Sequence, residues 1–424
     1  MLALILAMVP MVFPQATTSG SISGTVKDKS GGVIPGAEVR IVNTDTNAVR
    51  TVIADDTGFF TAQNVPAGRY SVEVALTGFK SAKVPVELNV RENRVANLVL
   101  EPGSPTEVVS VEAANVSQVE LRSGEVGNLI AGKQVTELPL NGRSFVQLAL
   151  LVPGASIDNG ANVRGTGLLS SVDMSVSGSA TNANMWLVDG ANNVDIGSGR
   201  TILVYPSVDS IAEFKVQRNS YGADMGASSG AQINVITKGG TNAFHGSVYE
   251  FIRNDRLNAN AFFLNSANQP KAPLRYNNFG YTLGGPILKD KLFFFWSQEW
   301  RRELRGITRN WNLPTALERV GDFSGPRSRN YPIPTDPYTG QPFPGNKIPQ
   351  SRLSPAGLAI LKLYPLPTPG AGTIDAKGNI QGNNWVASPK TSIPTRQEQV
   401  RIDYNLNRNN AIICLLYTSD AADE

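Results

Sequence analysis

The possible folds of this chain are limited above all by three long runs after residue 240 in which aromatic and small residues alternate. The runs read FHGSVYEFIRND, RYNNFGYTLGGPIL and KLFFFWSQEWRRELRG. In a β-strand, such alternation places one kind of residue on each face. The middle run has an apolar face and a small or polar face, formed respectively by Phe279, Tyr281 and Leu283 and by Gly280, Thr282 and Gly284. This pattern, with the tight turn KDK after it, is typical of transmembrane β-strands, although soluble β-sandwiches alternate too.

A long segment rich in Pro, Gly and Asn favours the membrane interpretation. It extends from about Gly306 to Thr395 and contains YPIPTDPYTGQPFPGNKIPQSRLSP. Compact soluble domains seldom contain so long an irregular segment, whereas outer-membrane barrels combine short periplasmic turns with long external loops. Within it, SPAGLAILKLYPLP predicts a short helix. We therefore expect residues 241–413 to form the first strands of an outer-membrane β-barrel and a long extracellular loop.

The composition argues against an enzyme. The 424 residues include one histidine and one cysteine, too few for a zinc site, a Cys/His pair or a disulfide framework. Ser-His-Asp catalysis would depend on His245, which lies in a strand-like run and is expected to be structural. With a net charge of +3 and no run of basic residues, nucleic acid is not an expected partner. We predict no catalytic residues, no metal site and no cofactor.

The two ends have distinct compositions. MLALILAMVPMVF is too short to span a membrane as a helix and resembles the apolar core of a secretory signal, so residues 1–16 are predicted to be a signal peptide. The usual basic start is missing, which suggests an upstream start codon; a buried apolar segment is the alternative. CLLYTSDAADE, residues 414–424, resembles the translation of a sequencing adapter. We therefore expect the natural protein to continue differently after Ile413, and this chain to be a fragment.

Residues 19–101 predict a β-sandwich. Seven short alternating runs, from SISGTVKD to RVANLVLE, are separated by turn signals such as KSGGVIPG, NTDTN and DDTG. Short strands with this punctuation indicate an antiparallel sandwich. Gly58 closes the DDTG turn and Gly68 closes the VPAG turn.

Residues 102–117 form a linker with one strand-like run. Pro102 to Pro105 resist regular pairing, and TEVVSVEA follows them as an isolated β-prone stretch. Such a segment either binds a partner's sheet edge by strand addition or forms the first strand of the next domain. The pattern itself leaves both open.

Residues 118–240 predict a compact α+β domain. GKQVTELPLNGRSFVQLALLVPGA indicates two short helices, and MSVSGSATNANMWLVDGANN indicates strands around an Asn-rich turn. GNLIAGKQ matches the spacing of a phosphate-binding loop at Gly127, Gly132 and Lys133. Gln134 replaces the Ser or Thr that would hold magnesium, so nucleotide binding is not expected.

Residues 19–101 resemble the carboxypeptidase regulatory-like domain, a transthyretin-type sandwich. The resemblance rests on successive patterns that read SGTVKD, PGAEV, DDTGFF and GRYSVEV. It implies an accessory or binding module and no peptidase activity.

Further segments resemble the Oar-like TonB-dependent outer-membrane transporters. They include VTELPLNGRSFVQLALLVPG, WLVDGANN, NNFGYTLGGPILKDKLFFFW and DPYTGQPFPGNKIPQSRLSPAGLAILKLYPLP, spread over most of the chain. The resemblance implies that residues 118–240 are a plug inside the barrel and that Gly239 and Gly240 form the hinge between plug and barrel. It also implies a periplasmic TonB box, which TonB would bind by strand addition, at Glu107, Val108, Val109, Ser110 and Val111.

The expected fold is thus mainly β: an N-terminal β-sandwich, an α+β plug domain and the first strands of an incomplete transmembrane β-barrel. The expected function is active transport across the bacterial outer membrane, with TonB and membrane lipid as partners. The extracellular ligand is open between oligosaccharide, peptide, siderophore and exported protein. A secreted or surface-attached adhesin with a carbohydrate-binding sandwich is the alternative.

Overall fold

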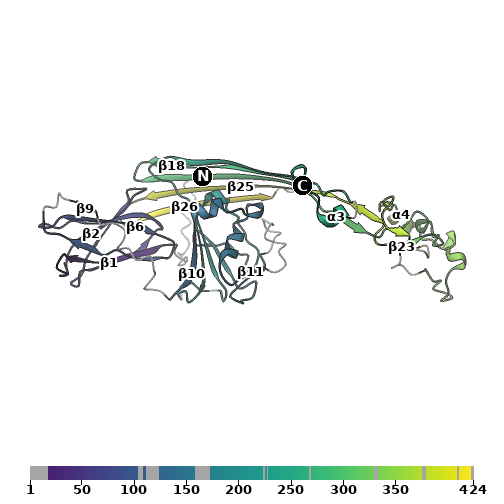
Figure 1. Ribbon diagram of the computed structural model, residues 1–424, viewed down its shortest axis with the longest axis horizontal. Coiled ribbons are helices and arrows are strands. Elements are labelled where there is room, and N and C mark those ends of the chain that lie inside the picture. The colour runs from purple at the N-terminus through teal and green to yellow at the C-terminus, as the bar shows by residue number, and fades with distance from the viewer. Residues whose placement is uncertain are drawn as a thin grey trace, which may run out of the picture. The chain divides into compact units, whose positions relative to one another are not determined.

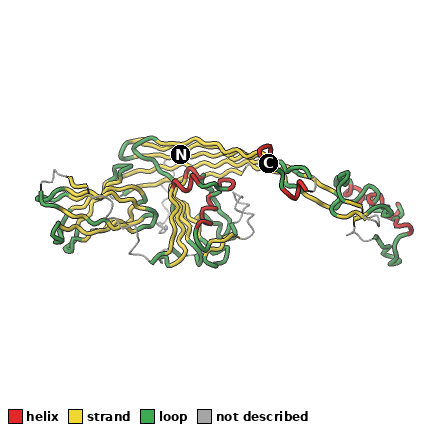
Figure 2. Tube along the Cα trace, in the orientation of Figure 1, coloured by secondary structure: helices red, strands yellow, loops and turns green. Residues whose placement is uncertain are grey.

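A computed structural model describes residues 18–103, 108–110, 124–157, 172–222, 225–226, 228–266, 269–328, 333–374, 379–407 and 410–421. The predicted signal peptide lies outside these residues. Strands predominate in what is described (Figure 2). Among the described residues, no helix has the length and apolarity needed to cross a bilayer. The chain divides into two compact units, residues 1–250, 279–300 and 395–424 in the first and residues 251–278 and 301–394 in the second.

The first domain of the first unit is the expected sandwich of two sheets (Figure 1). One sheet has the order β4-β1-β7, with β8 also paired to β1, and the other has the order β3-β2-β5-β6-β9. Apolar side chains from both sheets fill the space between them, including Ile22, Phe60 and Leu88. The strands are β1 (Gly20–Asp28), β2 (Glu38–Asn43), β3 (Val49–Ile53), β4 (Phe59–Val65), β5 (Gly68–Val74), β6 (Ser81–Leu88), β7 (Asn93–Val95), β8 (Leu98–Leu100) and β9 (Val108–Ser110).

The sandwich differs from the prediction in its last strands. RVANLVLE, expected as one strand, forms β7 and β8, and both pair with β1 in parallel. The break follows from close packing: a Cβ at Gly24 would overlap the Ala96 carbonyl, and Ala96 donates its N–H to Ser23. Asn97 then turns its side chain to the Thr25 N–H, at 3.1 Å. The expectation of a wholly antiparallel sandwich was therefore wrong.

The second domain, called here the central domain (residues 124–240), is built around a five-stranded sheet of order β10-β15-β16-β13-β14. Strand β16 lies in the middle and is buried along its whole length. Ring contacts among Phe145, Trp186, Tyr205 and Phe214 fill the core beside it. The strands are β10 (Val126–Ala131), β11 (Ala155–Ile157), β12 (Met174–Val176), β13 (Met185–Val188), β14 (Ala191–Asn192), β15 (Ile211–Asn219) and β16 (Gln232–Thr237).

The helices of the central domain are shorter than predicted. The segment expected as two helices forms α2 (Gly132–Glu137) and two 3-10 turns, η2 (Asn141–Arg143) and η3 (Phe145–Leu151). Gly142 and Arg143 both adopt positive φ, which ends regular helix there. A further turn, η5 (Val208–Ser210), leads into β15.

A sheet of long strands follows, in the order β17-β18-β19-β25-β26. It confirms the strands predicted after residue 240. The turn between β18 and β19 closes with Asp290 at a φ of 65° and with the Lys291 N–H bonded to the Leu288 carbonyl at 3.1 Å. The strands are β17 (His245–Asn254), β18 (Leu274–Leu288), β19 (Leu292–Gly306), β25 (Lys390–Asn405) and β26 (Ala411–Ala421).

Rings of β17 and of the residue before it cover glycines of β18. A Cβ at Gly280 would come within 2.6 Å of the Tyr249 hydroxyl, and one at Gly284 within 2.6 Å of His245 Nε2. Phe244 lies over Gly285 in the same way. Each of these three glycines of β18 faces a ring, and the absence of a side chain at these positions gives the rings room.

The second unit holds the long segment that was predicted as irregular. Its short helix is confirmed as α4 (Pro355–Leu361), capped by the Ser354 side chain on the Gly357 N–H. It also contains short strands that the sequence did not suggest: β20 (Arg309–Trp311) pairs with β24 (Trp385–Ala387), and their tryptophans stack with centroids 5.7 Å apart. The other elements are η6 (Asp255–Leu257), α3 (Phe262–Ser266), η7 (Glu318–Val320), β21 (Arg327–Ser328), η8 (Pro344–Asn346), η9 (Gln350–Arg352), β22 (Thr373–Ile374) and β23 (Asn379–Gln381).

Candidate functional site

Three residues of the predicted TonB box form an edge strand of the sandwich. Val108–Ser110 is β9, which pairs in parallel with the start of β6. The Cα partners are Ser81 with Val108, Ala82 with Val109 and Lys83 with Ser110. Glu107 and Val111 lie outside the described residues. The segment was expected to stand alone behind a linker, and this expectation was wrong.

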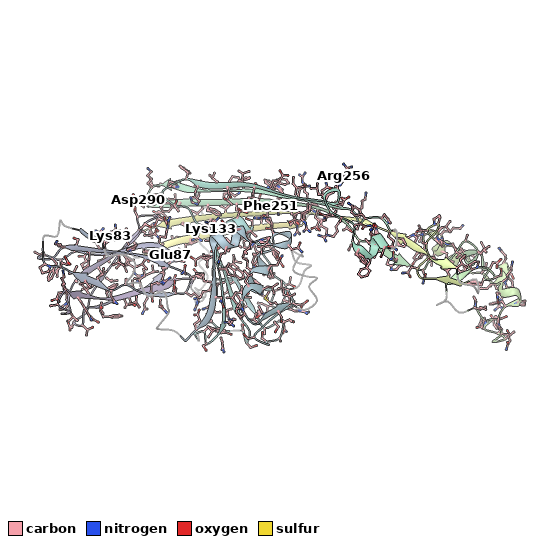
Figure 3. The ribbon with its side chains drawn as sticks, in the orientation of Figure 1. Lys83, Glu87, Lys133, Phe251, Arg256 and Asp290 are labelled. Atoms are coloured by element: carbon pink, nitrogen blue, oxygen red, sulfur yellow. The ribbon has the colours of Figure 1, made fainter. Side chains whose placement is uncertain are left out.

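The chain that leads to β9 is also held against the sandwich. Lys80 donates its N–H to the Glu101 carbonyl at 2.8 Å, and Gly103 donates its own to the Gly78 carbonyl at 3.1 Å. Phe79 and Pro102 form an antiparallel bridge between these bonds. The linker therefore starts along residues 78–80, directly before the part of β6 that receives β9. Lys83 and Glu87, labelled in Figure 3, lie on this strand.

A buried ionic cluster joins the central domain to the long-strand sheet. Asp189 accepts the Thr237 N–H at 3.0 Å and its hydroxyl at 2.7 Å. Arg401 of β25 lies 3.5 Å from the Asp189 carboxylate, donates to the Thr237 carbonyl at 3.1 Å and pairs with Asp403 at 2.9 Å. Asp189, whose side chain is 6% exposed, thus ties the end of β16 to β25. Tyr417 also donates to Asp189, but it belongs to the segment expected to be foreign.

A second cluster lies at the positive-φ Arg143 of η2. Arg143 pairs with Asp209 of the central domain, and its guanidinium lies 4.9 Å from the centroid of the Tyr249 ring. Tyr249 of β17 donates its hydroxyl to Glu299 of β19 at 2.9 Å. Neither cluster was singled out from the sequence. The sequence offered one indication of these clusters. Arg143 follows the glycine of NGR and Asp189 precedes the glycine of VDG, and such turns place polar side chains at strand ends.

The proposed hinge glycines lie where the central domain meets the long strands. A Cβ on Gly240 would come within 2.5 Å of the Phe294 carbonyl and 2.8 Å of the Gly285 carbonyl, both of them backbone atoms. At Gly239 the nearest atom would be the Asp403 carboxylate, at 3.0 Å. Close packing explains the glycine at position 240. A hinge role for the pair stays a prediction.

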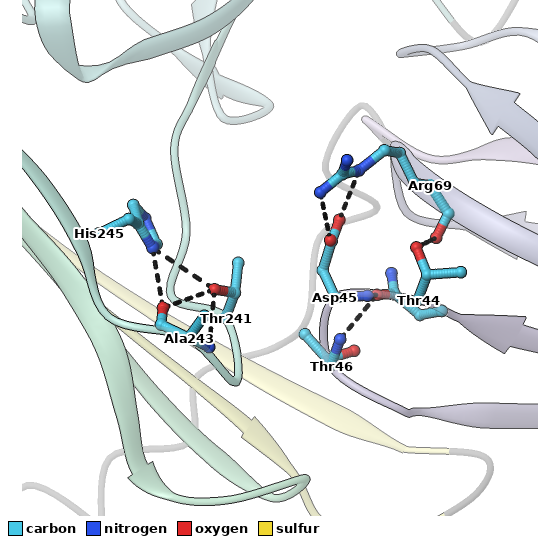
Figure 4. A network of polar contacts seen from close by, with 8 residues as sticks. Thr44, Asp45, Thr46, Arg69, Thr241, Ala243 and His245 are labelled. Carbon is cyan, nitrogen blue, oxygen red and sulfur yellow. Dashed lines mark hydrogen bonds and ion pairs between the residues drawn. The ribbon is translucent and has the colours of Figure 1, made fainter.

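The residues considered and set aside for chemistry have structural surroundings. Gly127 lies within β10, which pairs with β15, so GNLIAGK does not form a phosphate-binding loop. His245 begins β17, where Nδ1 lies 3.1 Å from the Ala243 carbonyl and 3.4 Å from the Thr241 hydroxyl (Figure 4). Its ring stacks on Phe295. Among the described residues, no group of three or more His, Cys, Asp or Glu side chains could hold a metal ion.

Comparison with known proteins gives the domains their family. Residues 21–101 match the carboxypeptidase regulatory-like domain, and residues 236–424 match the outer membrane beta barrel domain. The chain is 29% identical to the TonB-dependent transporter Oar of Myxococcus xanthus, over 65% of its own length. Over these residues the chain is similar to a TonB-dependent transporter of the Oar type. It spans 26% of the length of that relative.

Solved structures of outer-membrane proteins also align with this chain. The outer membrane transporter YddB from Escherichia coli covers 65% of the chain, with 30% of YddB covered, 13% identity and a TM-score of 0.35. The siderophore receptor PirA from Acinetobacter baumannii covers 69%, with 44% of PirA covered, 15% identity and a TM-score of 0.32. These scores are too low to establish a shared fold by themselves.

Proposed function

We propose that this chain is part of a transporter that moves a ligand across the bacterial outer membrane with energy delivered by TonB. The central domain would serve as the plug and the long-strand sheet as the lipid-facing wall beside it. The sandwich and the TonB box would lie in the periplasm. No covalent chemistry is involved in this proposal, which is supported by the similarity to the TonB-dependent transporter Oar.

The observation that carries the proposal is the distribution of polarity over the long-strand sheet. The face toward the central domain buries polar side chains as well as the rings of Phe293 and Phe295. Ser297 bonds Ser207 across the contact at 3.0 Å, and Thr282 and Glu299 are buried on the same face. The opposite face exposes apolar side chains, with Val248 88% and Trp296 40% exposed. A sheet in water would not bury these polar side chains and leave the apolar ones exposed, whereas strands between lumen and lipid have this arrangement.

Aromatic contacts on the exposed face agree with this interpretation. Tyr281 contacts both Trp296 and Trp300, with centroids 5.6 Å and 6.1 Å apart. Phe279 stacks on Trp300 at 5.4 Å. Rings that lie outside a barrel near the membrane surface form the aromatic girdles of outer-membrane proteins.

The deciding experiment is fractionation of cells that express the natural protein containing this chain. We expect it to stay in the outer-membrane pellet after washing with urea or carbonate and to be released by detergent. A urea-treated sample of a known peripheral protein serves as the control for complete washing. Release of folded protein without detergent would contradict the proposal and favour the secreted adhesin.

A further inference from the structure

We infer that the sandwich holds Val108–Ser110 of the TonB box, strand β9, ready for TonB, which adds its strand to the outer edge of β9 while β9 stays paired with β6. This inference rests on the proposed function. It assigns the sandwich, which has no role in the transport scheme so far, as a platform for the energy-transducing partner. The sheet of TonB would then continue the β3-β2-β5-β6-β9 sheet of the sandwich, with β9 paired to a strand on each side.

The position of β9 in its sheet is the first support. In the order β3-β2-β5-β6-β9, it is the last strand among those the structure describes. A strand has two edges of backbone donors and acceptors, and β6 uses one of them. The other edge is the kind of surface to which an extended peptide adds by main-chain hydrogen bonds.

The anchored linker is the second, independent support. The bonds from Lys80 to Glu101 and from Gly103 to Gly78 fix the chain on the sandwich before β9 begins. A box that had to leave the sandwich would not need such an anchor beside β6. An anchor does suit a box that is presented in place.

Ordering before binding gives the arrangement its energetic benefit. Fixing the backbone of a free segment opposes strand addition, because each residue loses conformational entropy. With β9 already extended on β6, that loss has occurred before TonB arrives. A preorganised box therefore binds more tightly than the same box in a free linker.

In the opposite arrangement, TonB and β6 compete for β9, so that β9 must leave β6 before TonB binds. A crosslink between β6 and β9 distinguishes the two arrangements. Lys83 and Ser110 are Cα partners across β6 and β9, and neighbouring strands lie about 4.7–4.9 Å apart, within the range of a disulfide. The variant K83C/S110C is made in the natural full-length protein, with Cys414→Ser wherever that residue is present. Binding of the TonB periplasmic domain is then measured with the disulfide formed and with it reduced.

We expect the oxidised protein to bind TonB at least as tightly as the reduced one, by a factor between one and about ten. Loss of binding on oxidation, with recovery on reduction, would overturn the inference, because β9 would then have to leave β6. Failure of the disulfide to form in folded protein would overturn it too. If the unmodified protein does not bind TonB at all, the proposed function itself fails.

A second variant loosens β9 without crosslinking. The ladder between β5 and β6 begins at the pair Val74–Ala82, so Ser81 pairs with β9 ahead of it. Proline is tolerated as the first residue of a strand, so Ser81→Pro should disturb β9 and leave the sandwich folded. We expect TonB binding to weaken about three- to tenfold, while the matched Ser81→Ala stays within about twofold.

Thermal unfolding of both Ser81 variants checks that the sandwich remains intact. Equal or tighter TonB binding by Ser81→Pro than by Ser81→Ala would overturn the inference, since a released box would then bind at least as well as a docked one.

Discussion

At the scale of single residues, the most informative carboxyl group is Glu213 on β15. It is partly buried, and burial raises its pKa to about 7, further raised by Glu92 and Glu87. The Val90 N–H, which donates to it at 2.9 Å, and Lys215 act in the opposite direction. A carboxyl group whose pKa rises on folding stabilises the fold when protonated. Its contribution is complete below the unfolded value of 4.5 and is lost as the pH rises through about 7.

We therefore expect the first unit to be more stable at pH 5 than at pH 8, with Glu213 contributing about 2–3 kcal/mol of the difference. Glu213→Gln should flatten this dependence, because the amide does not ionise. The free energy of unfolding is measured at both pH values by urea denaturation, with tryptophan fluorescence as the signal. Glu137→Gln, at an exposed position on α2, is the control and should leave the dependence unchanged. Equal pH dependence in both variants would contradict the assignment.

Asp189 gives a second prediction at this scale. It adopts a φ of 48°, which asparagine tolerates well, so Asp189→Asn removes the charge without straining the backbone. Arg401 then loses a buried partner, and we expect the free energy of unfolding to fall by about 1–3 kcal/mol. The exposed pair of Asp173 and Arg200 provides the control: Asp173→Asn should cost less than about 1 kcal/mol. Similar losses in equilibrium unfolding of the two variants would argue against a special role for Asp189.

At the scale of elements, the long strands allow a test of whether their exposed face contacts lipid or water. Leu283 lies on the apolar face of β18 and is 42% exposed. In a membrane, Leu283→Arg should destabilise the protein by about 2–4 kcal/mol if the site lies near the bilayer midplane. On a soluble sheet, a surface change of this kind typically costs less than about 0.5 kcal/mol. Urea unfolding in lipid vesicles measures the loss, with Leu283→Ala as the matched control for lost apolar surface. A neutral Leu283→Arg would favour the adhesin.

The elements also mark what the sequence can and cannot predict. Period-two alternation identified β17, β18 and β19. Strands β18 and β19 bury one face only, and β17 alternates between half-buried and exposed residues in its first half. The pairing of β7, β8 and β9 was missed, since parallel partners far apart in the chain leave no local pattern. Strand β10 was missed for a related reason: it alternates weakly, and its partner β15 lies about 80 residues later. The candidate site was the least predictable part from sequence, because its ionic clusters join residues that only the fold brings together.

At the scale of the whole molecule, the proposed transporter depends on a mechanical link from TonB to the central domain. Proline lacks the N–H that strand addition requires, so Val109→Pro in the full-length protein should abolish binding of the TonB periplasmic domain and, with it, energised uptake. Val109→Ala keeps the N–H and should bind within about twofold of the natural protein. Pull-down with the purified TonB domain measures both. Undiminished binding by Val109→Pro would remove the TonB-box assignment.

The rings of Phe244, His245 and Tyr249, seated on the glycines of β18, have a consequence for assembly. If β17 slipped by one residue, those rings would meet side chains or turn to the other surface of the sheet. A misaligned hairpin would therefore be rejected by steric overlap before the remaining strands arrive. The first two strands can thus act as a template of fixed alignment for the rest of the wall.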